Sequence, residues 1–224
     1  PPPPPPPPFF SPPPPPSERR LGLVGSEMCI RDSFRRHRRR HGVGHLRVGE
    51  EARVEANRAM LEAMGRVIHC GPLGTGLVVK LVTNQLWFVA AAAIGEGVAL
   101  GVGNGVELSV LWDAITDSVA DSFVARHDAP SIFAGHYDPS FTLDLCIKDL
   151  GLIGELSSML GTDLPMTDAA TATFARAADR YGADAGELHV ARRIEEDANL
   201  SFRMEGDWTP PWDCLLYTSD AADE

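Results

Sequence analysis

The sequence predicts a mainly helical protein in which a short βαβ unit precedes an all-helical domain. Three observations support this fold class. A single strand–helix–strand pattern occurs early in the chain. Apolar residues recur at helical spacing along most of the rest. In no long stretch do apolar and polar residues alternate with the two-residue period of a half-buried strand. The 224 residues are 44% hydrophobic and 23% charged, so there is enough apolar material for a buried core.

The βαβ unit is predicted from a short apolar run after His45 to the end of a second apolar run. The range Glu50–Met64 carries apolar residues at helical spacing, and Arg66–Cys70 has the composition of a strand. A turn-rich segment, Gly71–Gly76, follows. Its glycines permit a tight backbone and a close approach to another group.

A long apolar helix is predicted over Leu77–Leu100. A membrane span is the alternative interpretation, because the stretch is long enough to cross a bilayer. Polar residues interrupt it, however, and no basic flank follows, so we favour a buried central helix. The glycine-rich segment Gly101–Gly105 predicts a helix stop rather than a nucleotide-binding loop, because a helix precedes it and a strand does not.

Further helices are predicted wherever apolar residues recur at spacings of three and four. A loop long enough to be functional is predicted over Arg126–Ser140, which contains two prolines and a glycine. The predicted helices are Glu107–Ser118, Phe141–Leu160, Thr167–Tyr181 and Gly186–Asp197.

Charge and cysteine content restrict the function. From Leu46 to Asp213 there are 12 basic and 25 acidic residues, which argues against nucleic acid as the main ligand. The four cysteines have neither the paired spacing of a zinc site nor the density of a disulfide framework. The histidines are too dispersed to suggest a metal site. We therefore expect a protein of the reducing cytoplasm with no metal.

The two ends of the chain look foreign to the fold. Thirteen of the 19 prolines lie in the first sixteen residues. Leu23–Ser33 and Cys214–Asp223 resemble translated sequencing adaptors, so we expect the natural protein to lie between them. The basic run Phe34–His41 is either a nuclear or polyanion signal or out-of-frame sequence beside an adaptor junction.

Lysine is rare, since Lys80 and Lys148 are the only two against 18 arginines. Chance is one explanation. The other is that a compact, titratable amine is needed at these places. Lys80 lies early in the apolar helix, just after the glycines. Burial there disfavours the charged amine, which suits proton transfer to a carbonyl oxygen. Asn84, four residues later, shares its helix face and could orient the amine, hold a substrate oxygen, or form a plain interior hydrogen bond.

Two motifs resemble the β-hydroxyacid dehydrogenases, the group that includes 3-hydroxyisobutyrate dehydrogenase and tartronate semialdehyde reductase. They are Gly71–Asn84, reading GPLGTGLVVKLVTN, and Phe141–Leu150, reading FTLDLCIKDL. The likeness covers about Leu46 to Phe202. It implies the end of a Rossmann domain followed by an all-helical domain like the C-terminal domain of 6-phosphogluconate dehydrogenase.

The resemblance also implies a reaction, which is reversible hydride transfer between NAD or NADP and a short 3-hydroxy acid. It makes Lys80 the catalytic acid and base, with Asn84 as its helper and substrate ligand. Gly74 is implied to lie beside the substrate carboxylate, and Lys148 to reach the cofactor. Phe141 either lines the nicotinamide side or packs in the core. Asp149 is expected to hold its helix in place rather than react.

Three departures from the family limit what the chain can do by itself. Thr83 replaces the first of two adjacent asparagines. The glycine-rich phosphate fingerprint and the serine-glycine substrate strand are both missing. We therefore expect an enzyme fragment that is inactive alone. The expected domains are 1–45 (low complexity, disordered), 46–72 (end of the dinucleotide-binding domain), 73–202 (helical substrate and dimerisation domain) and 203–224 (disordered, adaptor-like tail).

The expected partners are a small hydroxy-acid substrate and further copies of the chain, with no nucleic acid and no membrane. The long apolar helix has more apolar surface than one small domain covers, which favours a homodimer or a higher homo-oligomer. Alternatives are an imine reductase, which Lys80 disfavours because such enzymes often replace the lysine, an enzyme like 6-phosphogluconate dehydrogenase, or a non-catalytic helical dimerisation module.

Overall fold

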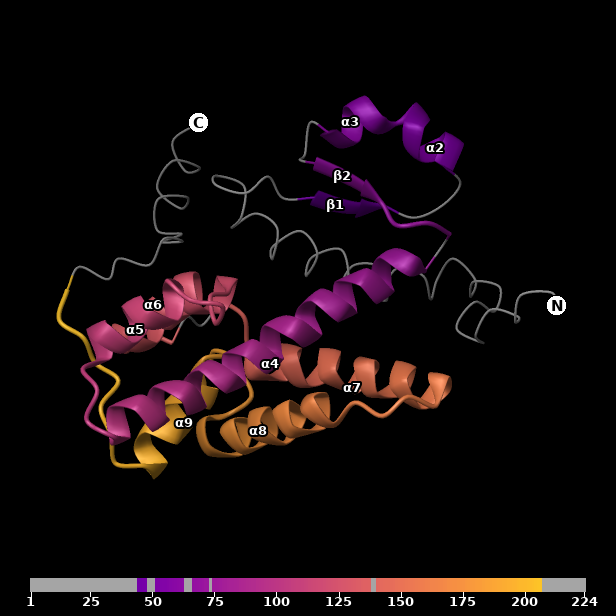
Figure 1. Ribbon diagram of the computed structural model, residues 1–224. Helices are drawn as coiled ribbons and strands as arrows, with labels where there is room; N and C mark the ends of the chain where they lie inside the picture. The colour runs from indigo at the N-terminus through magenta and orange to yellow at the C-terminus, as the bar shows by residue number, and fades with distance from the viewer. Residues whose placement is uncertain (1–43, 48–50, 63–65, 73, 138–139, 207–224) are drawn as a thin grey trace, which may run out of the picture. The chain divides into compact units, whose positions relative to one another are not determined.

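The computed structural model describes residues 44–47, 51–62, 66–72, 74–137 and 140–206 (Figure 1). The adaptor-like ends and the basic run Phe34–His41 lie outside these residues. The chain divides into two compact units, Pro1–Thr83 and Asn84–Glu224, and each is described by itself. The domain boundaries expected from the sequence stay predictions.

The first unit contains the predicted βαβ arrangement. Strands β1 (Gly44–Arg47) and β2 (Arg66–His69) pair in parallel, with Gly44 opposite Arg66 and Arg47 opposite His69. Parallel pairing needs a crossover, and helices α2 (Glu51–Ala56) and α3 (Arg58–Glu62) supply it. The mainly helical fold with a leading βαβ unit is confirmed.

The crossover differs from the prediction in being two short helices rather than one. The break falls at Asn57, whose backbone N–H donates to the Val54 carbonyl at 3.2 Å in a turn. Asparagine side chains compete with the helical backbone for hydrogen bonds, which favours such breaks. Val54 before the break and Leu61 after it are both buried, so each half still packs by an apolar residue.

Helix α4 (Thr75–Gly103) confirms the long apolar helix and extends it at both ends. It begins after a turn in which the Thr75 hydroxyl donates to the Pro72 carbonyl at 2.8 Å. It ends as predicted in the glycine segment. The Val106 N–H donates back to the Gly101 carbonyl at 3.1 Å, and Gly105 has the left-handed φ of +84° that closes a helix.

Helix α4 is also the one described helix with the length and composition of a membrane span, a property that core helices of soluble proteins share. Its buried face carries polar groups, including Lys80 and Asn84. Polar side chains are costly to place in lipid, and these two are buried within the protein instead.

In its described part the second unit is built of helices joined by short segments, two of which pair in an isolated antiparallel β-bridge between Thr142 and Gly186 (Figure 1). The helices predicted from spacing are confirmed with shifted ends. After the second part of α4 come α5 (Leu108–Thr116), η2 (Val124–Asp128), α6 (Ala129–Phe133), α7 (Leu143–Leu160), α8 (Pro165–Tyr181) and α9 (His189–Asp197). The last part of the chain packs as well, because Phe202 after α9 is fully buried.

The prediction of a loop over Arg126–Ser140 is wrong for the first half of that range, which is helical. The π-helical turn η2 runs directly into α6, and Ala129–Phe133 are all buried. Pro130 lies in the first turn of α6, where a helix needs no N–H donor from that residue. A proline that suggested a loop therefore begins a helix.

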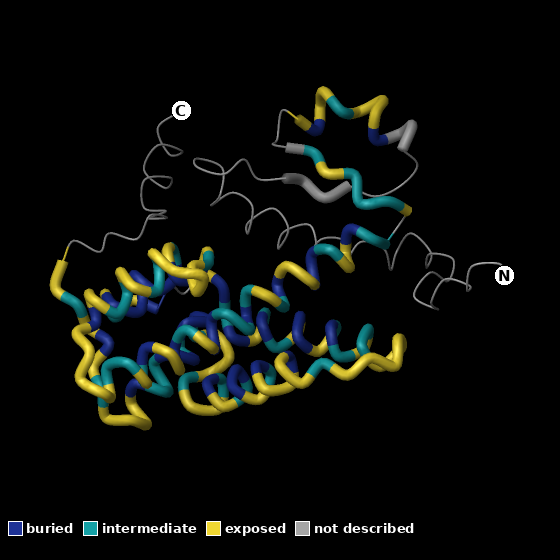
Figure 2. Tube along the Cα trace, in the orientation of Figure 1, coloured by how far each residue is buried: buried dark blue, intermediate teal, exposed yellow. Residues whose placement is uncertain are grey.

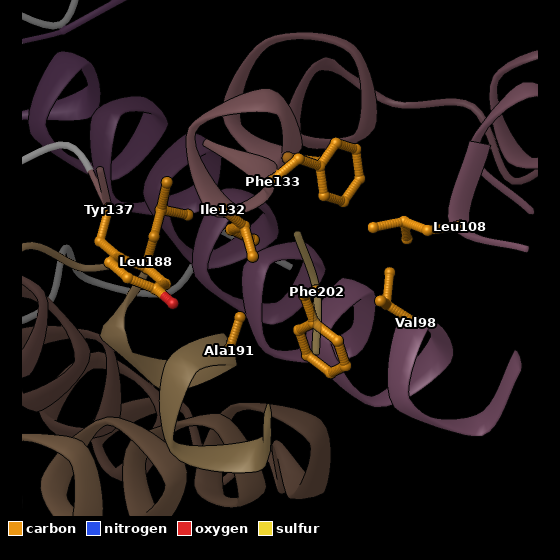
Figure 3. Close-up of a cluster of buried hydrophobic side chains, with 9 residues drawn as sticks. Val98, Leu108, Ile132, Phe133, Tyr137, Leu188, Ala191 and Phe202 are labelled. Atoms are coloured by element: carbon orange, nitrogen blue, oxygen red, sulfur yellow. The ribbon is translucent and has the colours of Figure 1, made fainter. Parts of the chain in front are cut away.

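A hydrophobic core joins segments far apart in the sequence (Figures 2 and 3). It gathers side chains from α4, α5, α6 and α9, from the segment after α6, and from the segments before and after α9. Its members are Val98, Leu108, Ala129, Ile132, Phe133, Tyr137, Leu188, Ala191 and Phe202.

The segment after α9 is attached to this core through Glu195. This buried carboxylate accepts hydrogen bonds from the Tyr137 hydroxyl at 2.8 Å and from the Phe202 backbone N–H at 2.7 Å. The Arg203 guanidinium pairs with it at 3.1 Å. Burial, followed by the hydrogen bond to Glu195, raises the pKa of Tyr137 to about 12. The packed unit thus includes Arg203, the first residue of the expected tail.

Two glycines of α4 make a matched test of this packing. A Cβ on Gly95 would lie 3.0 Å from the Ala191 backbone, whereas a Cβ on Gly97 meets nothing within 4 Å. We expect Gly97→Ala to raise the free energy of unfolding by about 0.5–1 kcal/mol, because alanine favours helices. Gly95→Ala should lower it by about 1–3 kcal/mol through overpacking of α4 against α9. Urea denaturation measures both, and equal signs would contradict the α4–α9 packing.

Candidate active site

The two polar residues singled out on α4 are both buried. Lys80 and Asn84 are each 5% exposed, and four residues of helix place them about one turn apart on one face. The hydroxyl of Thr83 donates to the Lys80 backbone carbonyl at 2.8 Å. That hydroxyl is therefore used within the helix.

In the second unit the structure brings Asn84 together with the Lys148 and Asp149 pair of α7. The Asn84 Nδ2 donates to Asp149 Oδ2 at 2.7 Å. Asp149 is 1% exposed, and its other oxygen, Oδ1, lies 4.0 Å from the Lys148 Nζ. The Lys148 side chain is 49% exposed, so its ammonium can reach solvent or a ligand. One buried carboxylate thus contacts two of the predicted site residues.

The direct bond between Asn84 and Asp149 was missed by the sequence argument. The two residues are 65 positions apart, and each had been considered on its own helix. The available signal was chemical: both are polar residues in largely apolar helices, and buried polar groups are nearly always hydrogen-bonded.

Phe141 lies in an aromatic cluster. Its ring centroid is 4.9 Å from that of Trp87 and 5.9 Å from that of Phe88, and the residue is buried. Core packing accounts for these contacts, which is one of the two roles expected for it. The indole N–H of Trp87 donates to Asp128 at 2.8 Å and holds one wall of the cluster in place. A cofactor contact of Phe141 stays a prediction.

Cys146, on the same helix as Asp149, is a structural thiol. It is fully buried, and burial raises its pKa well above the ordinary value, with the charges of Glu187, Asp149 and Asp144 acting in the same direction. A protonated thiol is a poor nucleophile. Cys146 is therefore a poor candidate for a nucleophile.

Gly74, the predicted substrate-side glycine, lies in the first unit at the start of α4. Its φ of +99° is in the left-handed region that favours glycine. Its carbonyl accepts from the N–H groups of Leu77 and Val78 at 3.1 and 3.3 Å, and so opens the helix. The N–H groups of a first helical turn favour an anion, which is compatible with the predicted carboxylate contact.

Over the part of the chain that the structure describes, no group of three or more His, Cys, Asp or Glu side chains could hold a metal ion.

Comparison with known proteins identifies the family of this arrangement. Residues 74–194 match the family described as NAD-binding of NADP-dependent 3-hydroxyisobutyrate dehydrogenase. The match contains the first motif from Gly74 onward, the whole second motif and every described helix from α4 into α9.

Individual relatives are similar as well. The chain is 33% identical over 125 residues to an L-threonate dehydrogenase of Cupriavidus necator, covering 55% of this chain and 42% of that protein. It is 34% identical over 128 residues to an NAD-dependent L-serine dehydrogenase of Pseudomonas aeruginosa, covering 53% of this chain and 42% of that protein. The chain thus spans about half the length of the curated relatives it matches, or somewhat less.

Solved structures agree with this picture. A 3-hydroxyisobutyrate dehydrogenase of Salmonella typhimurium superposes with a TM-score of 0.61 at 26% identity, over 65% of this chain and 52% of that one. A Mycobacterium tuberculosis 3-hydroxyisobutyrate dehydrogenase with L-serine gives 0.59 at 29% identity, over 66% and 53%.

Proposed function

This chain belongs to the family of the NAD-binding domain of NADP-dependent 3-hydroxyisobutyrate dehydrogenase, and we propose on that basis that it is part of an enzyme that transfers hydride between NAD or NADP and a short 3-hydroxy acid. The observation that carries the proposal is a buried amine, Lys80, one helical turn from a buried amide, Asn84, inside the matched segment. Buried amines and amides of this kind suit proton exchange with, and orientation of, a small polar substrate.

In the proposed reaction the chain's own residues handle the proton and the substrate. Lys80 Nζ takes the hydroxyl proton when the alcohol is oxidised and returns it when the aldehyde is reduced. Asn84 holds the reacting oxygen, and the turn at Gly74 receives the carboxylate. The nicotinamide, when bound, supplies or accepts the hydride.

Lys148 and Phe141 are suited to binding a dinucleotide cofactor beside the proposed substrate site. The Lys148 side chain is half exposed, and its ammonium lies 4.0 Å from the buried Asp149 carboxylate. The carboxylate attracts the ammonium, which stays accessible to a ligand. A cation placed this way can bind the oxygens of a cofactor. We propose it as the cofactor ligand of this chain, with Phe141 as a neighbouring apolar wall.

The relatives support the substrate class. Their names specify L-threonate, L-serine and 3-hydroxyisobutyrate, all short carboxylates that bear a hydroxyl group. We propose a substrate of the 3-hydroxyisobutyrate or tartronate semialdehyde type for this chain.

A graft tests the function. Residues 74–206 replace the matching segment of the Mycobacterium tuberculosis enzyme, and NADH or NADPH formation is followed with 3-hydroxyisobutyrate, L-threonate and L-serine as substrates. We expect turnover of at least one of these acids. A graft that folds and binds the cofactor yet oxidises none of them would contradict the proposal.

We further propose that a second copy of the chain covers an apolar face of α4. Val78, Val82 and Leu86 recur every four residues and are exposed, Leu86 at 66%. Leu86→Lys should shift the chain from dimer to monomer in size-exclusion chromatography with light scattering, whereas Leu160→Lys, at a residue 72% exposed on α7, should not. A monomeric wild-type chain would contradict this pairing.

We also propose a cytoplasmic location. Cys70 and Cys146 are free thiols, as expected in a reducing compartment.

A further inference from the structure

We propose that Asp149 is a positioning residue that fixes which way the Asn84 amide faces. The inference rests on the proposed function, since it specifies how Asn84 meets the substrate. Its basis is the hydrogen bond of 2.7 Å from Asn84 Nδ2 to Asp149 Oδ2, made between two buried side chains on α4 and α7.

The polarity of this bond follows from the chemistry of the two groups. An ionised carboxylate only accepts hydrogen bonds, so the amide must turn its NH₂ group toward Asp149. The reversed amide would bring two acceptor oxygens to hydrogen-bond distance in a buried place, which costs free energy. The Lys148 ammonium, 4.0 Å from the other oxygen of Asp149, supplies the opposite charge.

Among the residues that the structure describes, Asp149 is the one hydrogen-bond partner of this amide, so its carbonyl oxygen and its second N–H are held in fixed directions and can meet a ligand. The carbonyl oxygen can accept from a substrate hydroxyl, and the N–H can donate to a carbonyl oxygen. A reversible alcohol and aldehyde interconversion presents both groups in turn. The arrangement thus recognises a substrate whose reacting carbon bears oxygen in either oxidation state.

A purely structural link between α4 and α7 would not need this chemistry. Apolar side chains of similar volume join helices at least as well as a buried charged group does, because the charge must first be desolvated. Unlike an apolar side chain, a carboxylate fixes the orientation of the amide that it bonds. The same Asp149 carboxylate contacts Lys148, so it sets the substrate amide relative to the proposed cofactor ligand as well.

The test uses the full 224-residue chain and the side-chain NH₂ signals of Asn84 in the ¹⁵N NMR spectrum, assigned by their loss in Asn84→Ser. The test variant is Asp149→Asn, whose side chain has nearly the same shape as that of aspartate. Because asparagine can both donate and accept, it can bond the Asn84 amide in either orientation of that amide. The matched control is Glu155→Gln, which removes one charge from an exposed position of the same helix.

We expect Asp149→Asn to move the Asn84 NH₂ signals and speed their exchange with water, and Glu155→Gln to leave both unchanged. Titration of the graft with 3-hydroxyisobutyrate should show binding weakened about threefold to tenfold by Asp149→Asn, the scale of one oriented hydrogen bond. Unfolding in urea, measured alongside, separates this loss from a change in stability.

The outcomes distinguish the two proposals. Asn84 signals that do not respond to Asp149→Asn would overturn the positioning role. The positioning role would also be overturned if the Asn84 signals responded to Asp149→Asn but the acid bound as tightly as to the wild type. The orientation of the amide would then make no difference to ligand binding. Signals that respond to Asp149→Asn, together with a folded graft that turns over none of the three acids, would support the fixed amide and contradict the proposed function.

Discussion

Replacing Lys80 by alanine in the graft is expected to lower kcat by about 10²–10⁴-fold, the range that a positioned acid or base contributes to proton transfer. The physical reason is the burial of this amine, which keeps bulk water from taking over its task. The Michaelis constant of the acid should change much less, because Asn84 and the turn at Gly74 remain. The measurement is steady-state formation of NADH or NADPH at saturating cofactor.

Lys80→Arg separates charge from proton transfer. Arginine keeps the positive charge but stays protonated at any working pH, so this variant should be nearly as slow as Lys80→Ala. Lys148→Ala is the matched control among the lysines, and it should raise the Michaelis constant of the cofactor while largely sparing kcat. A fast Lys80→Arg variant would show that the amine acts as a charge, and a fast Lys80→Ala variant would remove the residue from the mechanism.

The fold could be predicted because its signals are local. The parallel strands, the glycine turn and the spacing of apolar residues in α4, α7 and α8 can all be read within short windows. The errors arose where local signals have two meanings. Asn57 interrupts a helix that its neighbours favour, and Pro130 opens α6 although a proline between two apolar segments equally suggests a loop.

The sequence offers candidate site residues but not the contacts between them. Lys80 and Asn84 could be paired because they lie on one helix. The contact of Asn84 with Asp149 depends on how α4 packs against α7, and no short window contains both. Glu195 illustrates the same limit, since a triad of acidic residues at a helix end suggests a solvated surface. One of the three is instead the buried acceptor for Tyr137 and Phe202.

The segment after α9 leads to the second large effect. Phe202→Ala is expected to lower the free energy of unfolding by about 3–5 kcal/mol, as for other large side chains removed from a core. Phe202 is 0% exposed and contacts a core built from four helices and the segments beside α9 (Figure 3). Urea denaturation followed by tryptophan fluorescence measures the loss, since Trp112 packs against the same core.

Leu160→Ala is the control, because this leucine is on the surface and its loss should change the free energy of unfolding by no more than about 0.5 kcal/mol. A chain that stops after Gly206 keeps Phe202 and its bond to Glu195, so it should unfold like the wild type. A chain that stops after Ser201 loses both and should be destabilised at least as much as Phe202→Ala, because the Glu195 carboxylate also loses its backbone donor and Arg203. Equal stability of the two truncated chains would mean that the core closes without this segment, and residue 202 would then lie outside the folded domain.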